Sequence, residues 1–405
     1  MINGIASRGV MLVINMIAVR TLIAEEYGNF SYLLSIVASI ATFSGLGSGV
    51  TTNAYLAKYR DKASLAAQKL VFSSIVFVTL LAIVFSSTLI PFFRIDATLT
   101  NTSPSMFLVA VFLMVWLLNL SGIMEGALNG LGEYKRLANN ALITFCSVSL
   151  LAYALIKTMG LAGAVLALLA QRFLSVSLNA WTLRHKGYLS LSFGLSTLKE
   201  SEILSAFRNL SLPATLGALM VGPALAISMK FVIEQPNGLS NIAYFSWVFQ
   251  VYVVAVFVPS ALGGYFISKF ARSGPSTNSV KKIFLFNLVF SSTVAAAFFF
   301  LKPVILGYAG ASYITDSSHI FNLMMLSVVL YSLNATFASY WPATGKGWWG
   351  LAMNALWATS LISISWALAP SHGADALAIA YLAAYIAQFS AQITLYNLLL
   401  RNTST

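Results

Sequence analysis

Long apolar stretches separated by short polar segments set the pattern of this chain. The stretches are about 18–25 residues long, which suits membrane-crossing helices, whereas barrel strands need only about 10 alternating residues. Because backbone polar groups in lipid must be satisfied within the protein, we expect the stretches to be helices. We predict about twelve spans, at residues 5–24, 29–52, 70–93, 105–127, 138–157, 161–183, 209–231, 242–265, 283–305, 318–340, 349–369 and 375–399.

The composition agrees with a protein embedded in lipid. Of the 405 residues, 59% are hydrophobic and 8% are charged, and the mean hydropathy is +0.83. A soluble domain carries about 25% charged residues, so this chain could not cover its surface for water. The single cysteine, Cys146, is expected to be a small core residue without disulfide or thiol chemistry. We interpret the apolar start of the chain as the first span, because no small-residue cleavage site follows it.

The net charge of +12 is best explained by membrane topology. Of the 23 Lys and Arg residues, 17 lie on the side of the predicted spans that holds both termini, and 5 lie on the other side. Basic residues collect in cytoplasmic loops, so both termini are expected in the cytoplasm. No aromatic–basic cluster accompanies this charge, and we expect no nucleic-acid partner.

Two parts of the chain resemble each other. The sequence at 137–142 recurs at 351–356; each copy follows a glycine-containing turn and precedes a Gly-Ala pair, at 163–164 and 373–374. A six-plus-six duplication would explain the echo, as in transporters whose halves move against each other; two similar helix starts are the alternative. The long connection at 184–208 then predicts two six-helix bundles, 1–197 and 198–405.

Ionisable side chains within the predicted spans are the main candidates for substrate binding. Placing one there costs about 2.5–3.5 kcal/mol, so each should face a cavity or a partner. Arg172 is the most central, and Gln171, Ser175 and Asn179 lie near it at helical spacing. We interpret Arg172 as lining a water-filled cavity; a buried arginine tied to carbonyls is the alternative.

Four further basic residues are weaker substrate-binding candidates, because each has a simple structural alternative. Snorkelling to the interface would explain Arg8 and Lys302. A local ion pair with Glu25 or Glu26 would explain Arg20, and a helical pair with Glu234 would explain Lys230.

Glu125 is the one acidic residue in the interior of a predicted span. It could bind a proton or another cation for coupling, or it could pair with a basic residue. Gln388 and Gln392 lie in a row with tyrosines in the last span and could bind sugar hydroxyls. Hydrogen bonding between helices is the alternative for this row.

The residue sets that most enzymes need are missing. The sequence has no paired carboxylates, no Asp-rich cytoplasmic loop and no phosphate-cradling loop. Its three histidines, His185, His319 and His372, are far apart in the sequence. We therefore expect neither an enzyme nor a metal site nor a cofactor. Without an ATP site, transport would run on an ion gradient or on the membrane potential.

Several short motifs occur in a characteristic order. They are Arg20-Thr21-Leu22 followed by Tyr27-Gly28, Gly45-Leu46-Gly47, Gly130-Leu131-Gly132-Glu133-Tyr134, Ser211-Leu212-Pro213 and Gly345-Lys346. In these motifs the chain resembles the O-antigen flippases, in the polysaccharide-transport branch of the multidrug/oligosaccharidyl-lipid/polysaccharide exporter (MOP) superfamily.

The resemblance implies two six-helix bundles around a central cationic cavity in the bacterial inner membrane. It implies transport of an undecaprenyl-pyrophosphate-linked sugar repeat unit from the cytoplasmic to the periplasmic leaflet, in lipopolysaccharide (O-antigen) biosynthesis. A polysaccharide polymerase and a chain-length regulator are the implied partners. Arg172, Arg8, Lys230 and Lys302 fall where cationic residues of the cavity would lie.

Two alternatives from other classes stay open at this point. A membrane polysaccharide polymerase usually has a long periplasmic loop with arginines, and no such loop is predicted here. A multidrug antiporter often relies on acidic residues within its spans, which are nearly absent here.

Overall fold

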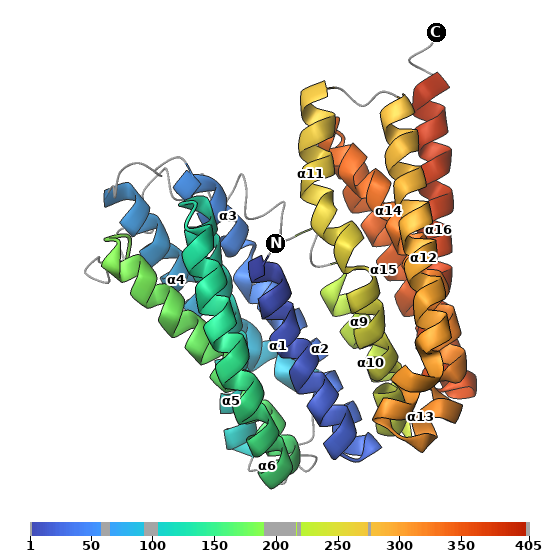
Figure 1. Cartoon of the computed structure of the whole chain (residues 1–405), viewed down its shortest axis with the longest axis horizontal. Coiled ribbons are helices and arrows are strands. Elements are labelled where there is room, and N and C mark those ends of the chain that lie inside the picture. Colours follow the sequence, from blue (N-terminus) through green and yellow to red (C-terminus); the bar gives the residue numbers. More distant parts are fainter. Residues whose placement is uncertain are drawn as a thin grey trace. The chain divides into compact units, whose positions relative to one another are not determined.

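The computed structural model describes residues 2–57, 65–92, 104–189, 216, 220–273 and 277–401. These residues are almost entirely helical (Figure 1). Eight of the described helices are long and apolar enough to cross a membrane, or nine if one bent pair counts as a single span. The predicted all-helical membrane fold is thereby confirmed for this part of the chain.

The first compact unit comprises residues up to Leu22 and residues Leu33–Pro223. In it, α1 and α5 pack on α6, and α3 and α4 pack on α5. Its helices are α1 (Ile2–Thr21), α2 (Ala24–Gly45, shared with the second unit), α3 (Ser48–Leu56), α4 (Leu65–Phe92), α5 (Pro104–Gly130) and α6 (Tyr134–His185).

Helix α6 is a hairpin of two spans. It counts 52 residues, but Gly160 interrupts it with φ 56° and ψ −132°. A hydrogen bond of 2.9 Å from Asn140 Nδ2 to Asn179 Oδ1 joins the two halves. A side chain at Gly163 would collide with the carbonyl oxygen of Leu155, so only glycine fits this tight turn. The hairpin accounts for both predicted spans, 138–157 and 161–183.

The second predicted span, 29–52, is broken in the structure. Helix α2 ends at Gly45 and α3 begins at Ser48, and the two helices are bent by 50°. Leu46 and Gly47 between them have φ values of 42° and 63°, which no α-helix accommodates. The sequence does not reveal this break, because the residues on both sides of it are apolar.

The second compact unit comprises Ile23–Tyr32 and Ala224–Thr405. In it, α11 and α12 pack on α14, and α14 and α15 pack on α16. Helices α10 and α11 together cover the predicted span 242–265. The helices are α9 (Gly222–Ile233), α10 (Gly238–Ala255), α11 (Phe257–Ser273), α12 (Thr277–Ala309), α13 (Ala311–Asp316), α14 (Ser318–Ala343), α15 (Gly347–His372) and α16 (Ala374–Arg401).

Paired glycine turns relate the two units. Gly132 and Gly160 have φ values of 76° and 56°, and Gly345 and Gly373 have φ values of 71° and 51°. Each pair is separated by 28 residues and flanks a membrane-spanning helix. The counterpart of Gly373 is therefore Gly160, and not Gly163 as the Gly-Ala echo had suggested. The shared turns support an internal duplication.

The position of Cys146 differs from the prediction. Cys146, expected in the core, is exposed, because it lies on the face of α6 that points away from the bundle.

The predicted boundary between residues 197 and 198 lies outside the described residues, as does the Ser211-Leu212-Pro213 motif. The division into bundles 1–197 and 198–405 stays a prediction.

Candidate functional site

Arg172 lies near the middle of a span. It comes twelve residues after Gly160 and thirteen residues before His185, the end of α6. With a rise of about 1.5 Å per residue, Arg172 is about 18–20 Å from either end of its half-helix. The hydrocarbon core of a bilayer is about 30 Å thick, so this guanidinium lies well inside it.

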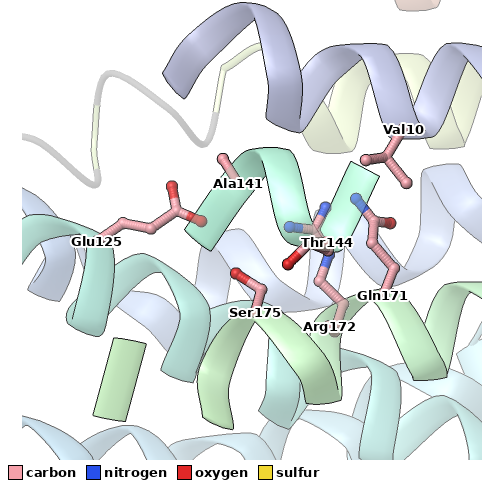
Figure 2. Close-up of a pocket in the computed structure, with 7 residues that line it drawn as sticks. All are labelled: Val10, Glu125, Ala141, Thr144, Gln171, Arg172 and Ser175. Carbon is pink, nitrogen blue, oxygen red and sulfur yellow. The ribbon is translucent and has the colours of Figure 1, made fainter. Parts of the chain in front are cut away.

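A small cavity in the first unit adjoins Arg172 (Figure 2). Its walls come from α1, α5 and both halves of α6. The volume is about 10 Å³, which is about the space that one water molecule needs. In this conformation the cavity has room for about one water molecule and is too small to hold a sugar phosphate. Its lining residues are Val10, Glu125, Ala141, Thr144, Gln171, Arg172 and Ser175.

Arg172 is half-buried beside this cavity. Among the described residues, none forms an ion pair or a hydrogen bond with this half-buried side chain. Glu125, on the same cavity, is the acidic group that acts on it electrostatically. A guanidinium has five N–H donors, and leaving them unsatisfied away from water is costly. Among the described residues, these donors are thus available to water or to an anionic ligand.

Glu125 is held in place by a serine on its own helix. Ser121 Oγ donates a hydrogen bond of 2.8 Å to Glu125 Oε1. The same hydroxyl lies 3.4 Å from Ser175 Oγ, which links α5 to the second half of α6. Close by, Gln171 is buried, and its Oε1 accepts no hydrogen bond from the described part of the chain. The cavity thus combines one cation, one anion and one unsatisfied amide oxygen.

The polar contacts continue along α6 toward its end. Asn179 Nδ2 lies 3.5 Å from Ser175 Oγ. Asn140 Nδ2 donates to Asn179 Oδ1 at 2.9 Å and to Thr182 Oγ1 at 3.1 Å. The chain of polar groups therefore reaches from the middle of the span to within three residues of His185.

Among the other predicted basic residues, Arg20, Lys230 and Lys302 do not line this cavity. The side chain of Arg8 lies outside the described residues. Arg20 is exposed in the last turn of α1. In the second unit, Lys230 Nζ lies 4.0 Å from Glu234 Oε1. Lys302 Nζ donates to Asn322 Oδ1 at 2.9 Å, so it contacts α14 at a half-buried position.

The two glutamines of α16 hydrogen-bond to neighbouring helices of the second unit. Gln392 Nε2 donates to Asn334 Oδ1 at 2.7 Å, and Trp341 Nε1 donates to Gln392 Oε1 at 3.3 Å. Gln388 Nε2 lies 3.3 Å from Asn354 Oδ1. Both glutamines are buried. Their contacts are those expected of polar residues that join helices in lipid.

Sequence reasoning missed Ser121 and Thr144 as neighbours of Arg172. Ser121 lies four residues before Glu125, so the helical period alone could have found it. Thr144 comes from the first half of the hairpin. Only the pairing of the two half-helices reveals its position.

Sequence comparison finds relatives that export polysaccharide. No family model matches the chain. It is 22% identical over 408 residues to the EPS I polysaccharide export inner membrane protein EpsE of Ralstonia nicotianae, covering 94% of this chain and 88% of that protein. The protein of the same name from Ralstonia solanacearum is 26% identical over 182 residues, covering 43% of this chain and 42% of the relative.

Structural comparison finds transporters. An inward-facing multidrug resistance MATE family transporter of the MOP superfamily matches with a TM-score of 0.74 and 16% identity, over 98% of this chain and 96% of that one. The outward-facing conformation of such a transporter matches with a TM-score of 0.63 and 15% identity, over 99% and 94%. A MOP superfamily transporter from Pyrococcus furiosus has a TM-score of 0.57 and 15% identity, over 97% and 95%.

The chain has the fold of the MATE transporters, and the predicted fold class is confirmed by these matches. The polysaccharide export proteins confirm the resemblance to the polysaccharide-transport members of the MOP superfamily and are inner membrane proteins. Together the relatives support a transporter and not an enzyme, as the sequence predicted. The central cationic cavity and the orientation of the termini stay predictions.

Proposed function

We propose that this protein is a flippase that moves an undecaprenyl-pyrophosphate-linked oligosaccharide, such as an O-antigen repeat unit, from the cytoplasmic to the periplasmic leaflet. The two predicted bundles would alternate access to the head group while the polyprenyl tail stays in lipid. The observation that carries the proposal is Arg172, a guanidinium deep in the membrane whose donors are unused by the described residues.

The chemistry of Arg172 favours a phosphate-bearing substrate. Phosphate oxygens only accept hydrogen bonds, and a guanidinium offers planar, paired donors that match them. A neutral sugar alone would not require a charge at this depth, and a cationic drug would be repelled by it. Arg8, Arg20, Lys230 and Lys302 are the further basic groups along the proposed path. Gln388 and Gln392 would bind sugar hydroxyls after giving up their hydrogen bonds to neighbouring helices.

The membrane potential would supply the driving force. Moving an anion outward gains about 2.3 kcal/mol per charge per 100 mV. Two phosphate charges at about 150 mV would gain about 7 kcal/mol, which suffices without ATP. We propose that Glu125, held by Ser121, is the coupling group that takes up a proton or another cation during the cycle.

The decisive experiment removes Arg172 in a strain that lacks the chromosomal gene. We expect Arg172→Ala to insert normally but to abolish surface polysaccharide, with lipid-linked repeat units accumulating in the inner membrane. Lys157→Ala is the matched control, because Lys157 is an exposed cation on the same helix, stacked on Tyr153 at 5.7 Å and away from the cavity. It should export normally.

Normal surface polysaccharide in the Arg172→Ala strain would remove Arg172 from the mechanism. Increased drug susceptibility of the deletion strain, with unchanged polysaccharide, would favour the multidrug antiporter instead. The solved structures of the same fold make that comparison necessary.

A further inference from the structure

The hairpin of α6 brings four basic residues together at one end of the first unit. Lys135 and Arg136 lie in the first turn of α6, Arg184 lies in its last turn, and Lys186 directly follows the helix. All four side chains are exposed. Because the two halves of α6 run antiparallel, these residues, distant in the sequence, form one surface, which we call the basic patch.

A single acidic residue joins the two sides of the basic patch. Lys186 Nζ lies 2.7 Å from Glu133 Oε1, and Arg136 Nε lies 3.6 Å from Glu133 Oε2. Four basic side chains and this one acidic side chain leave a net charge of +3. Beneath them, Leu137 and Tyr188 are buried in the same hydrophobic cluster, so the patch has a fixed base.

Neither helix stability nor topology alone accounts for the basic patch. The dipole of a helix favours negative charge in its first turn, yet α6 begins with Lys135 and Arg136 and has no acidic residue in that turn. The predicted topology explains why cations gather at this end of the spans. It does not explain why cations from both ends of the hairpin converge on one site.

The exposed surface that continues from the basic patch along α6 is aromatic and then apolar. Leu142 and Ile143 lie seven residues after the two cations of the first turn, hence on the same face of the helix, and both are exposed. On the second half of α6, Trp181 and Phe173 lie three and eleven residues before Arg184 and are also exposed. From the end of the unit toward the middle of the spans, the order is therefore cationic, aromatic and apolar.

We propose that the basic patch binds the phosphate of an anionic phospholipid from the surrounding membrane, whose acyl chains lie along the exposed apolar face of α6. Lys and Arg donate charge-assisted hydrogen bonds to phosphate oxygens, and basic clusters at the cytoplasmic membrane surface attract anionic lipids. Tryptophan is enriched at the level of the lipid head groups, where Trp181 would lie.

The arrangement of the surface favours a lipid over other anions. A phospholipid carries its phosphate and its hydrocarbon in the same order as the cationic and apolar parts of this surface, whereas a soluble phosphate would use the cations alone. None of the patch residues lines the cavity beside Arg172. The proposal is therefore independent of the proposed function.

The test measures lipid binding to the purified full-length protein by native mass spectrometry, which counts bound lipids and gives an apparent affinity for each. Phosphatidylglycerol is the anionic probe, and phosphatidylethanolamine with the same acyl chains is the zwitterionic one. The double variant Lys135→Gln and Arg184→Gln removes two cations and keeps both ion pairs of Glu133. The matched control, Lys281→Gln and Lys282→Gln, removes two exposed cations near the start of α12 in the second unit.

We expect a tightly bound phosphatidylglycerol whose apparent affinity falls about tenfold in the patch variant, because each cation near the surface contributes to the attraction. The control variant should bind this lipid as the unaltered protein does. Phosphatidylethanolamine, which has no net charge, should bind to the unaltered protein about tenfold more weakly than phosphatidylglycerol.

Equal losses in the two double variants would overturn the proposal, because net charge and not the basic patch would then govern binding. An unchanged affinity in the patch variant, or equal affinities for the two lipids, would also overturn it. Displacement of phosphatidylglycerol by an equal concentration of inorganic phosphate would reveal an anion site without an apolar part and would contradict the proposal as well. The single variant Lys135→Gln, with an expected loss of about threefold, keeps the test valid if the double variant fails to fold. No sugar substrate is needed, so a negative result leaves the flippase proposal standing.

Discussion

Asn140 offers a stability prediction whose magnitude follows from the structure. This side chain is 9% exposed and joins the two halves of α6 through hydrogen bonds of 2.9 Å to Asn179 and 3.1 Å to Thr182. Hydrogen bonds between membrane helices contribute about 0.6 kcal/mol each on average. Loss of both, with an acceptor on Asn179 left unsatisfied, should cost about 1–3 kcal/mol in Asn140→Ala.

The neighbouring residue provides the control. Asn139 is exposed on the same helix, so Asn139→Ala should change the free energy of unfolding by less than about 0.5 kcal/mol. Unfolding of the purified protein in mixed micelles, followed by circular dichroism as sodium dodecyl sulfate is titrated in, measures both variants. A double-mutant cycle with Asn179→Ala should show coupling of about 0.5–1.5 kcal/mol. Equal effects of Asn139→Ala and Asn140→Ala, or zero coupling, would refute the conclusion that these hydrogen bonds stabilise the pairing of the two halves of α6.

Three further predictions follow from the site and the fold. Glu125→Gln removes the acid that acts on Arg172. In the state of the proposed cycle in which the cavity beside Arg172 opens to substrate, inorganic pyrophosphate should therefore bind more tightly by roughly 1 kcal/mol, about fivefold, in calorimetry; weaker binding would contradict the electrostatic effect assigned to Glu125. Gly373→Ala forces a side chain into a backbone with φ 51° and toward Asn241, which should cost about 1–2 kcal/mol in the same unfolding titration, whereas Gly347→Ala meets nothing and should cost far less. Fluorescent reporters fused to either end of the chain should both fluoresce in the cytoplasm and alkaline phosphatase fusions should both be inactive; opposite results at the two ends would require an odd number of spans.

The sequence was sufficient for the fold class but not for the path of every helix. Apolar runs of the right length predicted membrane-crossing helices, because hydropathy reports directly on contact with lipid. The bend at Leu46 and Gly47 could not be predicted, since apolar residues continue through it and only the local backbone changes. The exposed position of Cys146 was missed for a related reason, because an apolar stretch does not say which of its faces meets lipid.

The candidate site could be predicted in part. The depth of Arg172 follows from its place within an apolar run, and the helical period places Ser175 near it. The approach of Glu125 could not be predicted, because it depends on how α5 packs against the second half of α6. The internal hydrogen bonds of Gln392 likewise depend on Asn334 and Trp341, which lie on another helix.

The single-glycine turns at Gly160 and Gly373 bear on how the chain enters the bilayer during synthesis. Each turn leaves almost no hydrophilic segment to be carried across the membrane. The two spans that it joins are therefore synthesised one directly after the other, without a loop between them. The two spans of each hairpin should therefore leave the insertion machinery as one body. A polar tag of twenty residues placed at either glycine would convert that joint entry into two separate events, with a corresponding delay in membrane integration.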